Sequence, residues 1–276
     1  MRIAVSIFLT FGIGFINLIP AQAGVVDVVV VGSELMVLGS NARDQILIRA
    51  SRTGGIQVNG LGNTFINQPE NKVVVINEYV GSIYADLGGG SDELKCTPYS
   101  FDGILRNLDI DLDVEIKCGS GNDLVILHPL MNVSRNVLIE GEAGNDYLWT
   151  GADTDGRVTI RGNDGNDFLE AHGIRVLDRL RIEGGNGVDR LKLHHSMITN
   201  RSFLRGGPGN DSFLIQHQDS FPAHSDIIAD GEGGTDRLEL AFSQAFLITM
   251  RNIQNPNANF VHDHGLTDAY LRLMAR

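Results

Sequence analysis

Residues 137–148 read Val-Leu-Ile-Glu-Gly-Glu-Ala-Gly-Asn-Asp-Tyr-Leu, and the same pattern returns along most of the chain. Its centre is a six-residue phrase with Gly at the fourth place and Asp at the sixth. The closing Asp residues of successive phrases are 31, 23, 21, 22, 22 and 25 residues apart. A repeat with a period of about 22 residues indicates stacked, self-similar units. The seven phrases occupy residues 87–92, 118–123, 141–146, 162–167, 184–189, 206–211 and 231–236.

Apolar residues alternate with polar ones on both sides of each phrase. Val137 and Ile139 precede the phrase of residues 141–146, and Leu148 follows its Asp by two places. Alternation with period two is typical of a strand with one buried face. A unit of strand, Gly turn, strand and return loop cannot bury that face alone, but stacked neighbours can. We therefore predict an all-β parallel β-solenoid, a β-roll or β-helix, with rungs of about 22 residues and Gly-Asp turns along one edge.

The composition agrees with this prediction. The 276 residues include 33 Gly, 23 Asp and 11 Glu, and Asp and Gly form turns better than helices. A hydrophobic fraction of 42% argues against disorder. The formal net charge of −12 excludes the electrostatic footprint of a nucleic-acid-binding protein and points to cations as partners.

The turn chemistry favours calcium. One Asp per rung forms a column in which carboxylates about 5 Å apart repel by ~0.8 kcal/mol in water and ~3 kcal/mol at an effective dielectric constant of 20. Ca²⁺ between the rungs reverses the sign, since it accepts 6–8 oxygens in flexible geometry. Mg²⁺ fits worse because it demands a tight octahedron, and Zn²⁺ prefers nitrogen and sulfur ligands. The alternative is that these Asp residues cap Gly turns without any metal.

The seven phrases resemble the hemolysin-type (RTX) calcium-binding repeat, whose pattern is G-G-x-G-x-D-x-U-x. The resemblance covers residues 83–240 well and 34–82 faintly. With one phrase per rung, it implies calcium along one edge only. Replacement of the first or second Gly, as at Leu87 or Asn163, implies weaker sites. Carried over residue by residue, it implies calcium at Asp92, Asp123, Asp146, Asp167, Asp189, Asp211 and Asp236, with the turn backbone of Gly90, Gly119, Gly121, Gly144, Gly165, Gly185, Gly187, Gly207, Gly209 and Gly234.

The chain divides into four parts. Residues 1–23 read as a cleavable signal peptide, with Met1-Arg2, an apolar run and Ala21-Gln22-Ala23, and the alternative is an uncleaved membrane anchor. We expect a secreted protein without a later membrane span, with the periplasm or the cell surface as alternative locations. Residues 24–82 read as degenerate rungs or a cap, with imperfect copies of the phrase at 39–44 and 59–64. Residues 83–240 carry the calcium-binding repeats, with an inserted loop at 97–107, and 241–276 form a C-terminal cap or tail with a short helix over 266–276.

No H-E-x-x-H and no G-x-S-x-G occurs, and the repeats leave no room for a separate catalytic domain. We therefore expect a noncatalytic calcium-binding protein with a structural, surface or adhesion role, whose partners are calcium ions and a cell-surface or matrix polysaccharide or protein. The alternative is a calcium-dependent β-helix enzyme that acts on acidic polysaccharides. Such a lyase needs a basic residue beside the metal, and Arg161, Arg190, Arg205 and Arg237 flank the turns.

Two further groups of residues stand out. Cys96 and Cys118 both fall on inward positions of neighbouring rungs, so a disulfide and two buried thiols are both open. His128, His172 and His194 share the position five residues past an Asp, and the last two fall on adjacent rungs. A zinc or catalytic site is conceivable there, but ordinary surface histidines at strand ends are the expectation.

Overall fold

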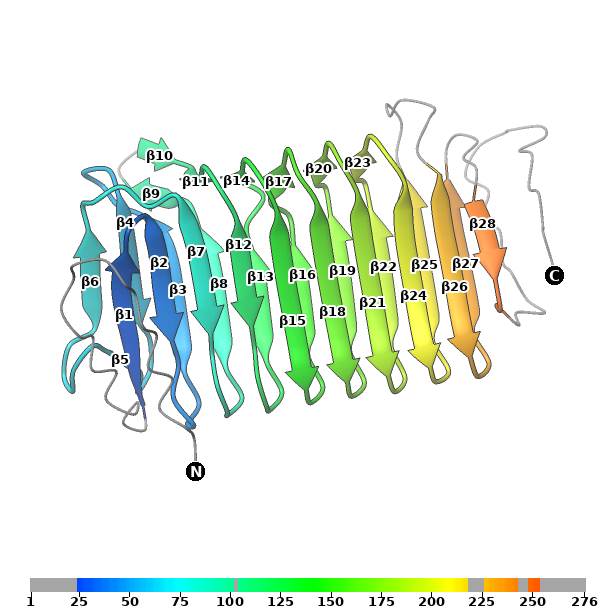
Figure 1. Cartoon of the computed structure of the whole chain (residues 1–276), viewed down its shortest axis with the longest axis horizontal. Helices are drawn as coiled ribbons and strands as arrows, with labels where there is room; N and C mark the ends of the chain where they lie inside the picture. The colour runs from blue at the N-terminus through cyan, green and yellow to red at the C-terminus, as the bar shows by residue number, and fades with distance from the viewer. Residues whose placement is uncertain (1–23, 102–103, 218–225, 243–247, 254–276) are drawn as a thin grey trace.

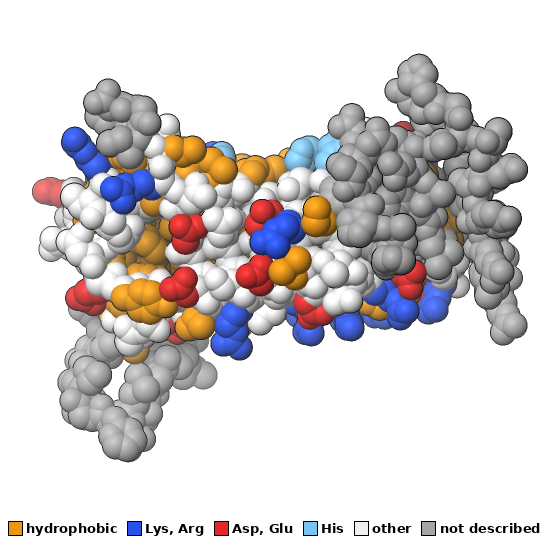
Figure 2. Space-filling model, turned by 90° about the horizontal axis from the view of Figure 1, so that it is seen from above, with side chains coloured by type: hydrophobic (Ala, Val, Ile, Leu, Met, Phe, Trp, Pro, Cys, Tyr) orange, Lys and Arg blue, Asp and Glu red, His pale blue; other side chains and the backbone are white. Residues whose placement is uncertain are grey.

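The chain folds as a parallel β-solenoid. The computed structural model describes residues 24–101, 104–217, 226–242 and 248–253, and within these ranges it contains strands and no helix. Successive coils stack into an elongated body, seen from the side in Figure 1 and from above in Figure 2. The predicted fold class is confirmed, with one Gly-Asp turn per coil.

Two long sheets form the main faces of the solenoid. The first holds eleven strands, in the spatial order β28 (Ile248–Arg251), β26 (Ile227–Gly233), β24 (Ser202–Pro208), β21 (Leu180–Asn186), β18 (Val158–Asp164), β15 (Val137–Ala143), β12 (Val114–Lys117), β7 (Ser82–Asp86), β2 (Glu34–Leu38), β1 (Val25–Val31) and β5 (Phe65–Ile66). The second holds ten, in the order β27 (Arg237–Phe242), β25 (Ser212–His217), β22 (Arg190–His194), β19 (Phe168–His172), β16 (Tyr147–Thr150), β13 (Leu124–Leu127), β8 (Glu93–Thr97), β3 (Gln45–Ala50), β4 (Ile56–Gly60) and β6 (Val73–Ile76).

A third, narrower sheet lies in the return segments, where the sequence predicted only loops. Its strands are two or three residues long. They are β11 (Leu108–Ile110), β14 (Met131–Val133), β17 (Asp153–Thr154), β20 (Arg175–Val176) and β23 (Met197–Ile198). The inserted loop at 97–107 includes a hairpin of β9 (Tyr99–Phe101) and β10 (Ile104–Arg106).

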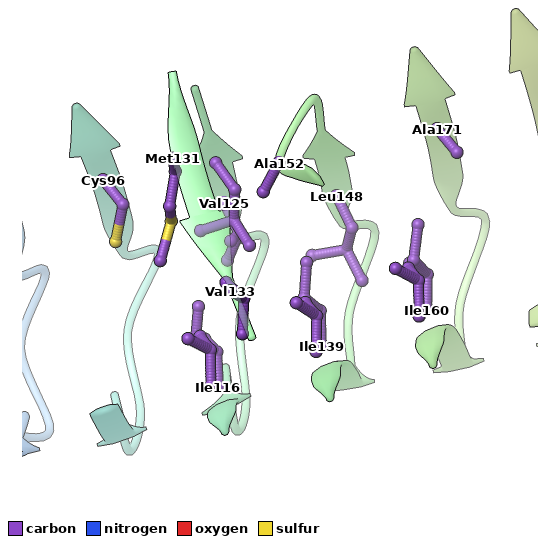
Figure 3. Packing of buried hydrophobic residues seen from close by; sticks show 14 of the residues in the cluster. Cys96, Ile116, Val125, Met131, Val133, Ile139, Leu148, Ala152, Ile160 and Ala171 are labelled. Atoms are coloured by element: carbon purple, nitrogen blue, oxygen red, sulfur yellow. The ribbon is translucent and has the colours of Figure 1, made fainter. Parts of the chain in front are cut away.

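Aliphatic side chains from all three sheets fill the interior. Val114, Ile116, Val137 and Ile139 are at most 1% exposed, and Ile116 pairs with Ile139 in the parallel register. Figure 3 shows the same kind of side chain stacked from one coil to the next. Each buried aliphatic side chain of this size contributes about 1.5–3 kcal/mol relative to an exposed one. The apolar residues that alternate with period two in the sequence are therefore the residues that form the core.

A row of alternating charges runs along the outer surface of the first sheet. Arg161 Nη1 lies 2.8 Å from Glu140 Oε1, and Arg161 Nε lies 3.0 Å from Glu183 Oε2 on the other neighbouring coil. The sign alternates at every step because residues of opposite charge are paired in register. The row is Asp86, Lys117, Glu140, Arg161, Glu183, Arg205, Asp230 and Arg251.

Residues 24–82 do not form a set of degenerate parallel rungs throughout. The phrase of residues 39–44 does form a turn of the solenoid, between β2 and β3. Residues 59–64 do not begin another parallel coil, because β4 pairs antiparallel with β3 and β6 antiparallel with β4. Strand β1 likewise pairs antiparallel with β2. Reversing the strand direction ends the stack of coils at this end of the molecule.

Two expectations concern segments at the chain ends. The signal peptide of residues 1–23 and the C-terminal helix of residues 266–276 both lie outside the described residues. In the described ranges, no helix has the length and apolarity that a membrane crossing requires.

Candidate metal-binding edge

The seven Gly-Asp phrases lie along one long edge of the solenoid, the lower edge in Figure 1. Each one connects a strand of the first sheet with a strand of the second, as residues 141–146 connect β15 with β16. The turns are in register because the strands on both sides are paired in register. The sequence prediction of one column of turns on one edge is therefore correct.

Glycine at the fourth place of each phrase is required by the stacking of the coils. Gly144 has φ +141°, and a Cβ added to it would overlap the carbonyl oxygen of Gly121 in the preceding coil. Only glycine permits both this φ and this close approach. The same stacking against the preceding turn holds at Gly90, Gly121, Gly144, Gly165, Gly187, Gly209 and Gly234.

The second place of each phrase also requires a left-handed backbone. Gly119, Gly185 and Gly207 occupy it with φ values of +91°, +112° and +106°. In other coils, Glu142 and Asn163 hold φ values of +70° and +74° without being glycine. A left-handed residue other than glycine costs about 1–2 kcal/mol. Replacement of the second Gly therefore strains the turn without changing its shape.

The Asp side chains of the phrases form a continuous ladder inside the turns. Asp146 Oδ1 accepts a hydrogen bond of 2.8 Å from the backbone N–H of Asp123, and Asp167 Oδ1 accepts one of 2.8 Å from Asp146 N–H. The same bond links every step. These side chains are at most 3% exposed. We expected carboxylates on the turn edge, and the structure places them under the turn, facing inward with the same parity as Leu148.

The ladder includes one more member than the seven predicted residues. Asp44 N–H donates to Asp92 Oδ1 at 2.7 Å, and the Asp44 side chain is fully buried. Its own Oδ2 accepts from Ser40 N–H at 2.6 Å. Thr64, which replaces Asp in the phrase of residues 59–64, accepts a bond from Gln45 N–H instead and stands outside the ladder. The column therefore begins at Asp44 and runs to Asp236.

The second carboxylate oxygen of each ladder residue is buried and has no hydrogen-bond partner among the described residues. Asp167 Oδ2 has no hydrogen-bond partner within the described part of the chain. A Cβ added to Gly162 would overlap both Asp167 Oδ2 and the carbonyl oxygen of Gly184, so these two oxygens border the same space. Only a proton or a cation satisfies oxygens arranged in this way. The corresponding oxygen is unpartnered in Asp92, Asp123, Asp146, Asp189, Asp211 and Asp236.

This environment favours the protonated form of the ladder carboxyls when no cation is bound. Burial is the main cause, and the hydrogen bond from the preceding Asp N–H opposes it. Burial raises the pKa of Asp92, Asp146 and Asp211 to about 7, and that of Asp123, Asp167 and Asp189 to about 6. The pKa values of Asp44 and Asp236 are raised by the same cause. A bound cation would oppose this shift by stabilising the charged form.

A second ladder lies beside the first, on the solvent side of the turns. Asn122 Oδ1 accepts from Asn145 N–H at 2.8 Å, and Asn145 Oδ1 accepts from Asn166 N–H at 2.7 Å. These residues occupy the fifth place of their phrases. We did not predict this ladder, although Asn at the same place in four of the seven phrases was a visible signal. It holds neighbouring turns together without metal.

The candidate residues away from this edge are placed as follows. Cys96 and Cys118 are buried free thiols, which decides between the two alternatives for this pair. His172 and His194 lie side by side on β19 and β22, with ring centroids 5.6 Å apart. His128 lies two coils away from His172, since Gly151 takes the equivalent place in the coil between them.

Of the four arginines that flank the turns in the lyase alternative, Arg161, Arg205 and Arg237 form ion pairs, and Arg190 forms none with another described residue. Arg161 and Arg205 line a shallow pocket of about 350 Å³ on the first sheet, together with Glu183 and Glu232. Arg161 bonds Glu140 and Glu183, and Arg205 lies 3.9 Å from both Glu183 and Glu232. The carboxylates hold the pKa of Arg161 above its usual range, which opposes a role as a proton acceptor.

Comparison with known proteins adds no family. No protein-family model, no curated protein and no solved structure matches this chain. The class of protein supported by the fold is therefore a parallel β-solenoid with an inward-facing Asp ladder on one edge.

Proposed function

We propose that this chain is a noncatalytic calcium-binding solenoid of the hemolysin-type repeat class, with a structural, surface or adhesion role. The observation that supports it is the buried Asp ladder, whose Oδ2 atoms have no hydrogen-bond partner among the described residues and, at Asp146, Asp167, Asp189 and Asp236, border a backbone carbonyl oxygen of the next coil. Hard oxygen donors of this kind suit Ca²⁺ better than Zn²⁺. Bare turn capping accounts for the Oδ1 atoms, which accept backbone N–H groups, but leaves the Oδ2 atoms unsatisfied.

The residues that would hold calcium follow from this geometry. Each step of the ladder supplies carboxylates from two successive coils, such as Asp146 and Asp167, and carbonyl oxygens from the adjoining glycine turns. Bound calcium would supply positive charge against the repulsion between the carboxylates. The chain contributes the rest, because hydrogen bonds from the preceding Asp residues fix each carboxylate in place. The proposed site is therefore structural and repeats along the edge.

Secretion would suit such a protein, since extracellular calcium modules bind with Kd values of about 10⁻⁴–10⁻³ M. We propose a secreted protein whose partner is a cell-surface or matrix polysaccharide or protein. The lyase alternative has less support, because Arg161, Arg205 and Arg237 are ion-paired and only Arg190 has no ion pair among the described residues.

Thermal unfolding of the mature chain, with calcium or with chelator, tests the proposal. At 10 mM Ca²⁺ and a Kd of 10⁻⁴–10⁻³ M, each occupied site stabilises the fold by about 1.4–2.7 kcal/mol. This amount raises the melting temperature by roughly 3–10 °C per site for a chain of this size. Circular dichroism at pH 8 measures the change, with Mg²⁺ as the control ion. Equal melting temperatures in 10 mM Ca²⁺ and in EDTA would sink the proposal.

Terbium gives a local version of the same test. Trp149, the only Trp, lies on β16 three residues past Asp146. Terbium in the adjoining turns should therefore be sensitised by Trp149 excitation, and calcium should displace it. We expect Asp146→Asn to weaken this emission more than Asp92→Asn, whose turn is two coils further away. Emission that both variants leave unchanged would place terbium elsewhere on the chain and count against the ladder.

A further inference from the structure

A second group of metal-ligating side chains lies at the opposite edge of the second sheet from the Gly-Asp turns. His172 ends β19 and His194 ends β22, and the two residues are paired in the parallel register. Glu170 lies two residues before His172, so it points from the same face of β19. Figure 2 shows histidine side chains gathered on the side of the solenoid that is seen from above.

The distances between the three side chains suit a small metal ion. Glu170 Oε1 lies 3.3 Å from His172 Nδ1 and 3.9 Å from His194 Nδ1. One ligand atom of each residue lies within 4.8 Å of those of the other two. A tetrahedral zinc ion with bonds of 2.0–2.1 Å holds its ligand atoms about 3.3 Å apart. Shifts of about 1 Å in side chains at strand ends would close the site.

The burial of this group is unusual for polar residues at a strand end. Glu170 is 8% exposed, and the His194 side chain is 14% exposed. His194 Nε2 is buried with no hydrogen-bond partner among the described residues, and the 3.9 Å from Nδ1 to Glu170 is too long for a hydrogen bond. A buried imidazole nitrogen without a partner destabilises the fold. A metal ion bound through Nε2 would give this buried nitrogen a partner, whereas one bound through Nδ1, the nitrogen 3.9 Å from Glu170, would not.

His128 shows what the same position looks like without a cluster. It occupies the equivalent place in its own coil, and its Nδ1 accepts a hydrogen bond of 3.1 Å from Leu130 N–H. Its neighbour in the next coil is Gly151, which offers no ligand. His128 is therefore an ordinary strand-end histidine, whereas His172 and His194 place two imidazoles side by side on neighbouring coils.

We propose that Glu170, His172 and His194 bind a borderline transition-metal ion, with Zn²⁺ as the foremost candidate. Two imidazoles and one carboxylate are a zinc-type ligand set, which leaves one of four positions open. Calcium is disfavoured here because it prefers oxygen ligands throughout. The site is independent of the Asp ladder and would staple two neighbouring coils.

Zinc titration of the full chain against a chromophoric chelator tests this proposal, with 10 mM Ca²⁺ present to occupy any calcium sites. We expect one Zn²⁺ per chain. His194→Gln should weaken zinc binding at least tenfold. Loss of a residue that only hydrogen-bonds to a metal ligand already weakens metal binding about 10–100-fold, and His194 is a direct ligand in this proposal. His128→Gln is the matched control, because it removes a histidine from the same position of another coil, and it should leave the Kd unchanged.

A second readout uses the neighbouring indole. The Trp149 ring lies 6.1 Å from the His172 ring, so Co²⁺ or Cu²⁺ at this site should quench the fluorescence of the only Trp. His172→Gln should abolish the quenching, and its half-exposed side chain makes this variant the safer one for folding. Circular dichroism melts verify that each variant is folded. Absence of stoichiometric zinc binding, or equal affinity in His172→Gln and the parent chain, would overturn the proposal.

Discussion

The Asp ladder predicts an inverted pH dependence of stability for the metal-free chain. The ladder carboxyls have a higher pKa in the folded chain than the unfolded value of 3.8. The folded state therefore binds more protons than the unfolded state between about pH 4 and pH 7. Their contribution to stability is fully present below the unfolded pKa and is lost as the pH rises through 6 and 7. We expect the chain in chelator to be more stable at pH 5 than at pH 8.

The size of the effect follows from the individual pKa values. Between pH 5 and pH 8, a carboxyl with a folded pKa of about 6 loses about 1 kcal/mol, and one with a pKa of about 7 loses about 3 kcal/mol. The losses do not add fully, because neighbouring ladder residues titrate as a coupled set. His194 acts in the opposite direction, since burial lowers its pKa, but it is a single group. At about 2–4 °C per kcal/mol, the melting temperature should fall by at least ~5 °C.

Asp167→Asn separates the ladder from other pH effects. Its Oδ1 still accepts the hydrogen bond from Asp146 N–H, and an amide nitrogen at the place of Oδ2 can donate to the Gly184 carbonyl. We expect this variant to be more stable than the parent chain at pH 8 in EDTA by about 1 kcal/mol, and to gain less from calcium. Asp155→Asn, which removes an exposed carboxylate with a side chain 54% accessible, is the control of equal charge.

Thermal melts by circular dichroism in EDTA, at pH 5, 6, 7 and 8 and constant ionic strength, measure the effect. A melting temperature that stays constant or rises from pH 5 to pH 8 would refute the reasoning. The same conclusion would follow if Asp167→Asn were as destabilised at pH 8 as a cavity-forming core variant. Either result would mean that the ladder carboxylates are already satisfied as anions in the metal-free chain.

Two further predictions concern the packing of the coils. Gly165→Ala should destabilise the fold by at least about 3 kcal/mol, because its Cβ would overlap the Gly144 carbonyl and its φ is +141°. Gly173→Ala should destabilise it by only about 1 kcal/mol, because nothing lies within 4 Å of its Cβ at φ +66°. Denaturant unfolding of both variants measures the difference, and equal losses would contradict the stacking argument. Cys96 and Cys118 should react with a thiol reagent only on unfolding, because both are buried and burial raises the pKa of Cys96 to about 12. Rapid labelling of the native chain would contradict their buried placement.

Much of the fold could be predicted because the repeat carries its own register. The alternation at Val137, Ile139 and Leu148 identifies the inward face, and the fixed distance from each Asp aligns one coil with the next. The alternating charges of Glu140 and Arg161 encode the same alignment, since only this register places opposite charges side by side. Strands and turns of this kind depend on residues that are close in the sequence, so they can be predicted from the sequence alone.

The candidate sites depended more on the tertiary structure. The sequence determined which residues form the Asp column, but not that Asp146 faces inward with one oxygen bonded to a backbone N–H and the other unpaired. It placed His172 and His194 on adjacent coils and missed Glu170, two residues before His172. Burial and hydrogen bonding of a side chain are set by atoms from coils about 22 residues away in both directions. The tertiary structure alone therefore determines whether a carboxylate or an imidazole in this protein contacts water, a hydrogen-bond donor or a position suited to a metal ion.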